Sequence, residues 1–157
     1  MVRSARLFTL LFIRDSSRAR VLLIRKKRGF GRGLWNGIGG KVEDGEPVRE
    51  AMLREAWEEA RIRPRNAEWR GVLVFSNASS SGFEDMLVHV FLADAFEGVP
   101  RETEEALPRW FSRDALPFDE MWEDDTHWLP LLLAGKRVSG FFSFKDWTLV
   151  EWRVWHD

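Results

Sequence analysis

The sequence contains neither cysteine nor tyrosine among its 157 residues, and it has no long apolar run. Without cysteine, a disulfide framework and a thiolate metal site are both excluded. The longest apolar run near the start, residues 7–13, is interrupted by Thr9. It is too short to span a bilayer, and it lacks the pattern of a signal-peptide cleavage site. We therefore expect a cytoplasmic protein that has no membrane partner.

An excess of charge of one sign is also missing, since 24 basic residues nearly balance 25 acidic ones and leave a formal net charge of −1. A near-neutral chain gives no electrostatic reason to expect long nucleic acid as a partner. A small polyanionic substrate would need local positive charge instead. With 157 residues, 45% of them hydrophobic, the chain is long enough to bury one full core. We expect a single domain over residues 1–157 and a monomer.

Acidic residues gather in the stretch Gly40–Ile62, which reads GKVEDGEPVREAMLREAWEEARI. Within it Glu55, Glu58 and Glu59 are spaced i, i+3 and i+4, so on a helix all three carboxylates project from one face. Like charges at this spacing repel, and the helix macrodipole disfavours anions in the last turns. A cation would offset both effects, and oxygen ligands this close suit Mg²⁺ or Mn²⁺. For three glutamates alone, the alternative is a solvated acidic helix face.

The flanking residues favour the metal site. Gly40 and Glu46 precede the cluster and Arg54 stands directly before Glu55, which gives the spacing Gly-x5-Glu-x7-Arg-Glu-x2-Glu-Glu. This spacing resembles the signature of the Nudix hydrolases, which cleave nucleoside diphosphates linked to another moiety, and Ile62 fits its final aliphatic position. Six fixed matches would occur by chance roughly once in 10^5 chains of this length.

One residue departs from that signature: the family has glycine where this chain has Arg61. Glycine there would fit a left-handed helix terminus, which a residue with a Cβ adopts only at a cost of about 1 kcal/mol. The sequence therefore allows two ends for this helix, and the first is at about Ala60. The alternative is a helix that runs on until Arg63, because Pro64 disfavours helical geometry in the residue before it.

The rest of the chain predicts strands around two helices. The helix of the signature should begin at Pro47, reach about Ala60 and pack Leu53, Trp57 and Ala60 on the sheet, opposite the glutamates. A second helix should begin at Asp124 or Asp125. Strands are expected at residues 6–14, 21–24, 69–75, 86–95, 107–111, 138–147 and 149–155. The prediction is an α/β fold, a Nudix-type α/β/α sandwich with a mixed sheet between helices.

A basic, glycine-rich stretch follows the second expected strand, at residues 26–33. Its cations and backbone amides could approach phosphates, although such stretches are as often mere connections and this one lacks a P-loop ending. The Nudix resemblance implies that Lys26 and Lys41 contact phosphates; the alternative is two ordinary surface lysines.

The same resemblance implies a catalytic role for the acidic cluster. Its metal ligands would be Glu55, Glu58 and Glu59, with the carbonyl of Gly39 and the downstream Glu105 assisting. Metal ions would neutralise the phosphates and make bound water a better nucleophile. Either Glu55 or Glu105 would take the proton, and Arg54 would orient Glu55.

Outside the signature, the similarity narrows to those Nudix hydrolases that convert oxidised purine nucleoside triphosphates, such as 8-oxo-dGTP and 2-hydroxy-dATP, to monophosphate and pyrophosphate. It rests on short matches such as Trp35-Asn36-Gly37, Met121-Trp122 and Asp124-Asp125. The residues implied for the base and its pocket are Asn36, Trp122, Asp124, Asp125, Thr9, Phe30, Phe75 and Met86. The alternatives are core packing for Trp122 and helix capping for the two aspartates. Two departures, Leu34 for an arginine and Asn77 for a phenylalanine, would change the polarity near the pocket.

Two other functions compete with this one. The first is a Nudix hydrolase that acts on ADP-ribose, a dinucleoside polyphosphate or a capped RNA end, which the group of Trp122, Asp124 and Asp125 disfavours. The second is a catalytically silent Nudix-fold binding module. A pure binder has no need for three mutually repelling glutamates, so the intact cluster disfavours this reading.

Overall fold

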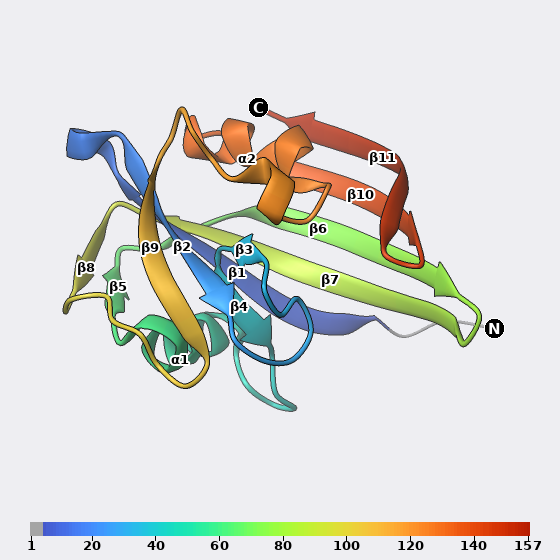
Figure 1. The fold of residues 1–157 in the computed structure, drawn as a ribbon, viewed down its shortest axis with the longest axis horizontal. Helices are drawn as coiled ribbons and strands as arrows, with labels where there is room; N and C mark the ends of the chain where they lie inside the picture. Colours follow the sequence, from blue (N-terminus) through green and yellow to red (C-terminus); the bar gives the residue numbers. More distant parts are fainter. Residues whose placement is uncertain (1–4) are drawn as a thin grey trace.

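The computed structural model describes residues 5–157, and a large mixed β-sheet forms its centre (Figure 1). The strands are β1 (Arg6–Asp15), β2 (Arg20–Lys26), β3 (Trp35–Asn36), β4 (Ile38–Lys41), β5 (Arg63–Arg65), β6 (Glu68–Ser79), β7 (Gly82–Ala93), β8 (Ala95–Glu97), β9 (Ala106–Ser112), β10 (Val138–Lys145) and β11 (Thr148–His156). The helices are α1 (Val48–Ala60) and α2 (Asp125–Leu133), with short 3-10 turns at Ser16–Arg18 and Phe118–Glu120.

The order of strands across the sheet is β11-β10-β6-β7-β1-β2-β3, with β4 paired to β1 and β9 paired to β2, whereas β5 and β8 form a separate pair. Strand β1 is the junction of this arrangement. It pairs in parallel with β7, and on its other side it pairs antiparallel first with β4 and then with β2. The first two strands form an antiparallel hairpin, and the expected mixed sheet is confirmed.

Two cores lie on the two faces of this sheet. Along β1, Leu10 and Phe12 belong to a core that includes Trp128 of α2, whereas Leu11 and Ile13 belong to a core that includes Met52 of α1. Alternate side chains of a strand point to opposite faces, so the two helices cover opposite sides, as Figure 1 also shows. The α/β/α sandwich is confirmed. None of the helices within residues 5–157 is long and apolar enough to cross a membrane.

The buried face of α1 differs from the predicted one. Ala60 is buried as expected, but Trp57 is 41% exposed, and the inward stripe runs through Met52 and Ala56 to Glu59. The indole of Trp57 lies instead beneath the guanidinium of Arg63, 4.2 Å from the ring centroid. The helix is thus rotated so that one of its three carboxylates points into the protein.

Several strand boundaries also differ. The expected strand 69–75 is longer in the structure, because residues 76–79 continue β6 and pair with Gly82–Asp85, which leaves only a short turn. The expected strand 138–147 ends at Lys145, and Asp146 and Trp147 form a turn. Strands β3 and β4 were not predicted, because both are too short to give a periodic pattern and two of the four residues of β4 are glycines.

The end of α1 settles the question that Arg61 raised. The helix ends at Ala60, and Arg61 adopts the left-handed conformation with φ 57° and ψ 37°. The alternative of a helix that continues to Arg63 is therefore wrong. The Arg61 amide donates to the Trp57 carbonyl, and its guanidinium donates a second hydrogen bond to the same oxygen at 3.0 Å. These bonds and the contact with the Trp57 ring offset part of the backbone strain.

A comparison of two variants tests this helix ending. Arg61→Gly should keep or raise stability, by up to about 1 kcal/mol, because glycine adopts the left-handed conformation without a Cβ clash. Arg61→Ala should lower stability, because it keeps the clash and loses the side-chain hydrogen bond. Urea denaturation of both proteins measures the difference; equal midpoints would contradict the left-handed ending.

Candidate active site

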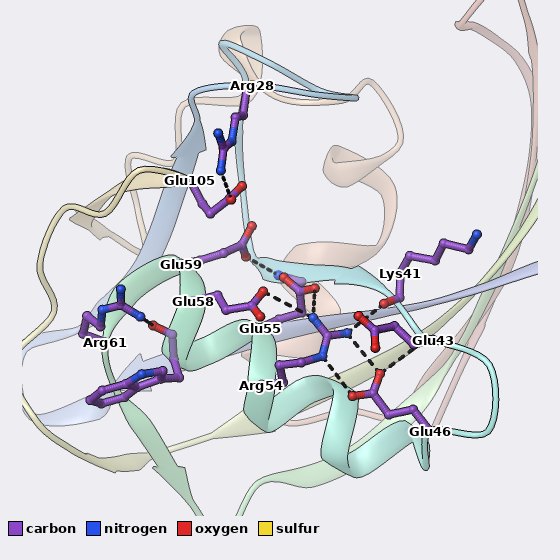
Figure 2. Close-up of polar contacts among 12 residues, drawn as sticks. Arg28, Lys41, Glu43, Glu46, Arg54, Glu55, Glu58, Glu59, Arg61 and Glu105 are labelled. Carbon is purple, nitrogen blue, oxygen red and sulfur yellow. Dashed lines mark hydrogen bonds and ion pairs between the residues drawn. The ribbon is translucent and has the colours of Figure 1, made fainter.

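The three predicted glutamates of α1 lie in different environments (Figure 2). Glu59 is buried, with 2% of its surface exposed, and its Oε1 accepts a hydrogen bond from the amide of Gly39 at 2.8 Å. The side chain of Glu55 is mostly buried, whereas that of Glu58 is 46% exposed. Together they form a carboxylate face that begins beneath β4 and ends in solvent.

Arg54 connects two glutamates of this face, Glu55 and Glu58, to Glu46. Its Nε and Nη2 donate to both oxygens of Glu46 at 2.9 and 3.0 Å, and Nη2 also donates to the Lys41 carbonyl. Its Nη1 donates to Glu55 at 2.8 Å and to Glu58 at 3.3 Å (Figure 2). The bidentate pair with Glu46 fixes the plane of the guanidinium, and this plane in turn orients Glu55. The predicted contact between Arg54 and Glu55 is present.

Two glycines allow β4 to lie this close to its neighbours. A Cβ on Gly39 would come within 1.9 Å of the Thr9 carbonyl oxygen, and a Cβ on Gly40 would come within 2.6 Å of Glu55 Oε1. Any larger residue at either position would push β4 away from β1 or from α1. The glycines of the signature region therefore serve close packing between the strand and the carboxylate face.

Glu105 lies near this face but is held by another partner. Its carboxylate forms an ion pair with Arg28, in the loop after β2, and this guanidinium lowers the pKa of Glu105. Figure 2 shows the pair above the end of α1 that carries Glu59. Sequence reasoning missed Arg28, which gave no signal beyond the basic character of its loop.

Burial makes the carboxylate face a demanding electrostatic site. Desolvation, together with the nearby charge of Glu55, raises the pKa of Glu59 to about 8, while the hydrogen bond from Gly39 opposes this shift. Desolvation also raises the pKa of Glu55, while Arg54 opposes that shift. Two acidic groups that resist ionisation, side by side, require either protons or a cation.

This donor set suits a hard divalent cation, because every candidate ligand is an oxygen and two of the carboxylates are desolvated. Within residues 5–157, however, no three acidic or histidine side chains converge closely enough to hold a metal ion. Glu55 and Glu58 are drawn toward Arg54 instead, and Glu105 is drawn toward Arg28.

A cavity of about 260 Å³ lies beside this face. Its lining includes all ten residues that the sequence nominated for substrate binding: Thr9, Lys26, Phe30, Asn36, Lys41, Phe75, Met86, Trp122, Asp124 and Asp125. Gly39 and Gly40 line it too, so the strand that contacts the buried carboxylates also forms a wall of the cavity. Its volume is below the roughly 300 Å³ at which pockets for whole drug-sized ligands begin, so it suits one ring system.

Two buried aspartates lie in the wall of this cavity. Asp124 Oδ2 accepts a hydrogen bond from Trp128 Nε1 at 2.7 Å, and the carboxyl groups of Asp124 and Asp125 are hydrogen-bonded to each other. Burial raises the pKa of both carboxyl groups, and the neighbouring Asp124 raises that of Asp125 further. Neither caps α2 through its side chain, so the capping alternative is wrong.

Two polar atoms of this cavity have no hydrogen-bond partner among residues 5–157. They are Asp125 Oδ2 and the hydroxyl of Thr9, which are buried, and both residues line the cavity. Asn36 Oδ1 accepts from the amide of Gly37, which fixes the orientation of its side-chain amide. A flat ligand with polar edges would satisfy the unpaired groups, whereas an apolar ligand would leave them unpaired.

Comparison with known proteins decides the family. The chain matches the NUDIX domain model over residues 5–132. It belongs to the Nudix family. It is 43% identical over 143 residues, 91% of this chain and 89% of the relative, to an oxidized purine nucleoside triphosphate hydrolase of Mus musculus. A protein of that name from Danio rerio is 42% identical over 142 residues, 90% of this chain and 88% of the relative.

The solved structures agree with the fold. The structure of a protein described as mMutator MutT from Bacillus halodurans superposes with a TM-score of 0.80, is 27% identical and covers 95% of this chain and 97% of its own. Nudix hydrolases act on small nucleotide substrates, and they generally require a divalent metal such as Mg²⁺.

Several lining residues of the Nudix cavity were not predicted. Trp128 and Phe144 were placed in a helix and in a strand, as the structure confirms, but without a role in the pocket. Trp147 was placed in a strand, whereas it stands in a turn and closes one side of the cavity. Residue type gave no signal, because the chain has nine tryptophans and most of them pack elsewhere.

The raised pKa of Glu59 predicts an unusual dependence of stability on pH. Between its ordinary pKa of 4.5 and about 8, the folded protein keeps a proton that the unfolded chain releases. Without a divalent cation, stability should therefore fall as pH rises through this window, by at most about 1.4 kcal/mol per pH unit. Added Mg²⁺ should stabilise the protein more at pH 8 than at pH 5.5.

Thermal melts in EDTA and in excess Mg²⁺ across this range measure both effects. Glu59→Gln should flatten the slope and reduce the stabilisation by Mg²⁺. Glu50→Gln, at an exposed position in the first turn of the same helix, is the matched control and should behave like the wild type. A slope that survives in Glu59→Gln would show that another group is responsible.

Proposed function

We propose that this Nudix protein hydrolyses oxidised purine nucleoside triphosphates, of the 8-oxo-dGTP and 2-hydroxy-dATP type, to the monophosphate and pyrophosphate, with Mg²⁺ as the metal. One observation carries the proposal: the cavity that holds the paired aspartates ends at Gly39 and Gly40, which contact the carboxylate face. A base in the cavity would place its phosphates over the glutamates. The names of the mouse and zebrafish relatives support the same substrate class.

The proposed roles on the phosphate side follow from the contacts. Glu55, Glu58 and Glu59 would hold the metal, with the Gly39 carbonyl and Glu105 completing the set. When bound, Mg²⁺ would neutralise phosphate charge and activate water. Arg54 keeps Glu55 in place through its pairing with Glu46, so Glu55 is held ready to accept a proton; Glu105, paired with Arg28, is the other candidate.

Lys26 and Lys41 would supply the local positive charge that the overall composition lacks. Both line the cavity, at the ends of β2 and β4. The charge of Lys26 also opposes the raised pKa values of Glu55 and Glu59. Phosphates that bind between these lysines and the metal would have their charge balanced from both sides.

On the base side, burial makes both aspartates resist ionisation, so one proton on the pair would let it act as donor and acceptor and present more than one hydrogen-bond pattern to a purine edge. Trp122 would stack on the base, with Phe75 and Met86 forming the apolar surround. The predicted monomeric state and cytoplasmic location stay predictions.

A turnover screen tests this function. With Mg²⁺, the protein should hydrolyse 8-oxo-dGTP and 2-hydroxy-dATP faster than dGTP and dATP, and it should release pyrophosphate. A dNDP should be a poor substrate, because the site is built for three phosphates. Glu58→Gln should lose activity by orders of magnitude while its melting temperature stays near that of the wild type, since it removes a ligand charge but little volume. Glu50→Gln should retain full activity.

The outcomes separate the competing functions. Undiminished hydrolysis in excess EDTA would overturn the metal assignment, and release of orthophosphate would overturn the cleavage position. Preference for ADP-ribose, a dinucleoside polyphosphate or a capped RNA end would favour the second hydrolase function. Tight binding of nucleotides without any turnover would favour a binding module.

The aspartate pair makes a separate prediction about selectivity. Asp124→Asn and Asp125→Asn each fix one donor pattern, so each should change the ratio of kcat/KM between 8-oxo-dGTP and 2-hydroxy-dATP, by roughly tenfold or more for one lost hydrogen bond. The pH dependence of the ratio should flatten in both. Wild-type ratios in both variants, together with an unchanged KM in Trp122→Ala, would place the base elsewhere.

A further inference from the structure

The turn between β10 and β11 carries an unusual pair of residues. Lys145 pairs with Thr148, so Asp146 and Trp147 are the two residues of the loop, with φ values of 48° and 60°. Two successive left-handed residues make a type I′ turn, whose second position strongly favours glycine. A tryptophan there has an unfavourable backbone conformation, so something outside the turn must hold it.

A buried amide holds this turn. Asn77 of β6, 2% exposed, accepts a hydrogen bond from the backbone amide of Trp147 through its Oδ1 at 2.8 Å. The amide of Asp146 donates to the carbonyl of Ala78 at 2.8 Å. The turn is thus bound to β6 at two successive residues. The polarity of Asn77 lies near the pocket and not in its wall, because its side chain does not line the cavity and its oxygen accepts from the amide of Trp147.

The ring of Trp147 lines the cavity in which the base is proposed to bind. The Trp147 ring centroid lies 4.7 Å from that of Phe30, 5.6 Å from that of Trp122 and 5.7 Å from that of Phe144, and all four residues line the cavity. Phe30 is exposed, and Trp147 is half-buried. These two rings, from the loop after β2 and from the β10–β11 turn, form an outer aromatic wall between the cavity and solvent.

We propose that Trp147, oriented by the buried amide of Asn77, is a specificity-determining residue of the base pocket, which selects nucleotides with a large flat purine over those with a pyrimidine. The proposal rests on the proposed function and deepens it. A ring that is already fixed gives contact area without an ordering cost on binding. A purine is wide enough to touch both Trp122 and Trp147, whereas a pyrimidine that stacks on Trp122 leaves the outer wall without a partner.

This assignment predicts a change in KM rather than in kcat, because the ring contacts of Trp147 are with Phe30, Trp122 and Phe144 on the base side of the cavity. The alternative is that Trp147 merely stabilises the hairpin. Replacement by glycine separates the two roles, because it removes the ring while the conformation of the turn disfavours tryptophan and favours glycine.

Trp147→Gly is therefore the central variant, since it removes the wall and introduces the residue that the turn prefers. We expect its KM for purine nucleoside triphosphates to rise roughly five- to tenfold with little change in kcat, and its preference for dGTP over dTTP to fall by a similar factor. Trp147→Phe, which keeps a ring, should recover most of the affinity. A stabilising role alone predicts a lower melting temperature in Trp147→Gly and an unchanged KM.

Asn77→Ala tests the positioning step. It removes the acceptor of the Trp147 amide, so the KM for purine nucleotides should rise without the ring being deleted. The double variant Asn77→Ala with Trp147→Gly should show a KM no higher than that of Trp147→Gly alone, because the amide then has no ring to orient. Additive increases would show that Asn77 acts independently of Trp147. If Asn77→Ala does not fold, the glycine and phenylalanine variants still decide the role of the ring.

Two further variants keep the outcomes distinct. Trp155 lies on the same hairpin, is 54% exposed and does not line the cavity. The variant Trp155→Ala should therefore keep the wild-type KM. Trp122→Ala reports on the base pocket as a whole. If Trp122→Ala raises KM and Trp147→Gly does not, the inference is overturned and the proposed function stands. If neither changes KM for any purine nucleotide, the proposed base pocket itself is wrong. Calorimetry with dGMP and dTMP repeats the comparison without turnover.

Discussion

The burial of the Glu59 carboxylate against the amide of Gly39 is the contact on which the site depends. It joins α1 to β4 by a hydrogen bond of 2.8 Å. Strand β4 is in turn fixed to β1, where Thr9 pairs with Gly40. Because Thr9 also lines the base cavity, the pairing of β4 with β1 connects the carboxylate face to the base pocket. A shift of either strand would change the distance between the two parts.

The same contact explains why the site needs a positive partner. One backbone amide cannot compensate a buried carboxylate fully, as the pKa of about 8 for Glu59 indicates. Arg54 of the same helix is already paired with Glu46 and directed at Glu55 and Glu58, and the pKa of Glu59 is raised despite the charge of Lys26. Glu59 is therefore left with either a proton or a bound cation. Glu59 therefore couples folding to cation binding, because the carboxylate that is buried on folding is the group that needs the cation.

Much of this arrangement could be predicted from the sequence, because the relevant signals are local or come from the family resemblance. The spacing of Glu55, Glu58 and Glu59 predicted a helix that carries all three on one face, and the structure has a helix from Val48 to Ala60. The ten residues nominated for substrate binding lie in five or more separate segments, yet all line one cavity. Residue spacing could not have joined those segments; the resemblance to Nudix hydrolases did.

The features that were missed depend on contacts between distant segments. The rotation of α1 that exposes Trp57 and buries Glu59 depends on Gly39, twenty residues away. The ion pair of Glu105 depends on Arg28, on a different loop. Likewise, the role of Asn77 depends on the parallel register that places it beside Phe144, next to the β10–β11 turn. A pattern within one segment cannot report any of these.

Arg61 and Trp147 show that a strained backbone alone does not indicate function. Both are large residues in the left-handed conformation, and in both the backbone amide has a hydrogen-bond acceptor, the Trp57 carbonyl for Arg61 and Asn77 for Trp147. Arg61 directs its side chain back to the exposed end of its own helix, so its strain is compensated locally. Trp147 directs its ring into a cavity built from many separate segments, and the acceptor that holds its amide is a buried side chain of β6. A compensation that involves so much of the fold is hard to explain by the turn itself. It is explained if the position of the ring matters to what the cavity binds.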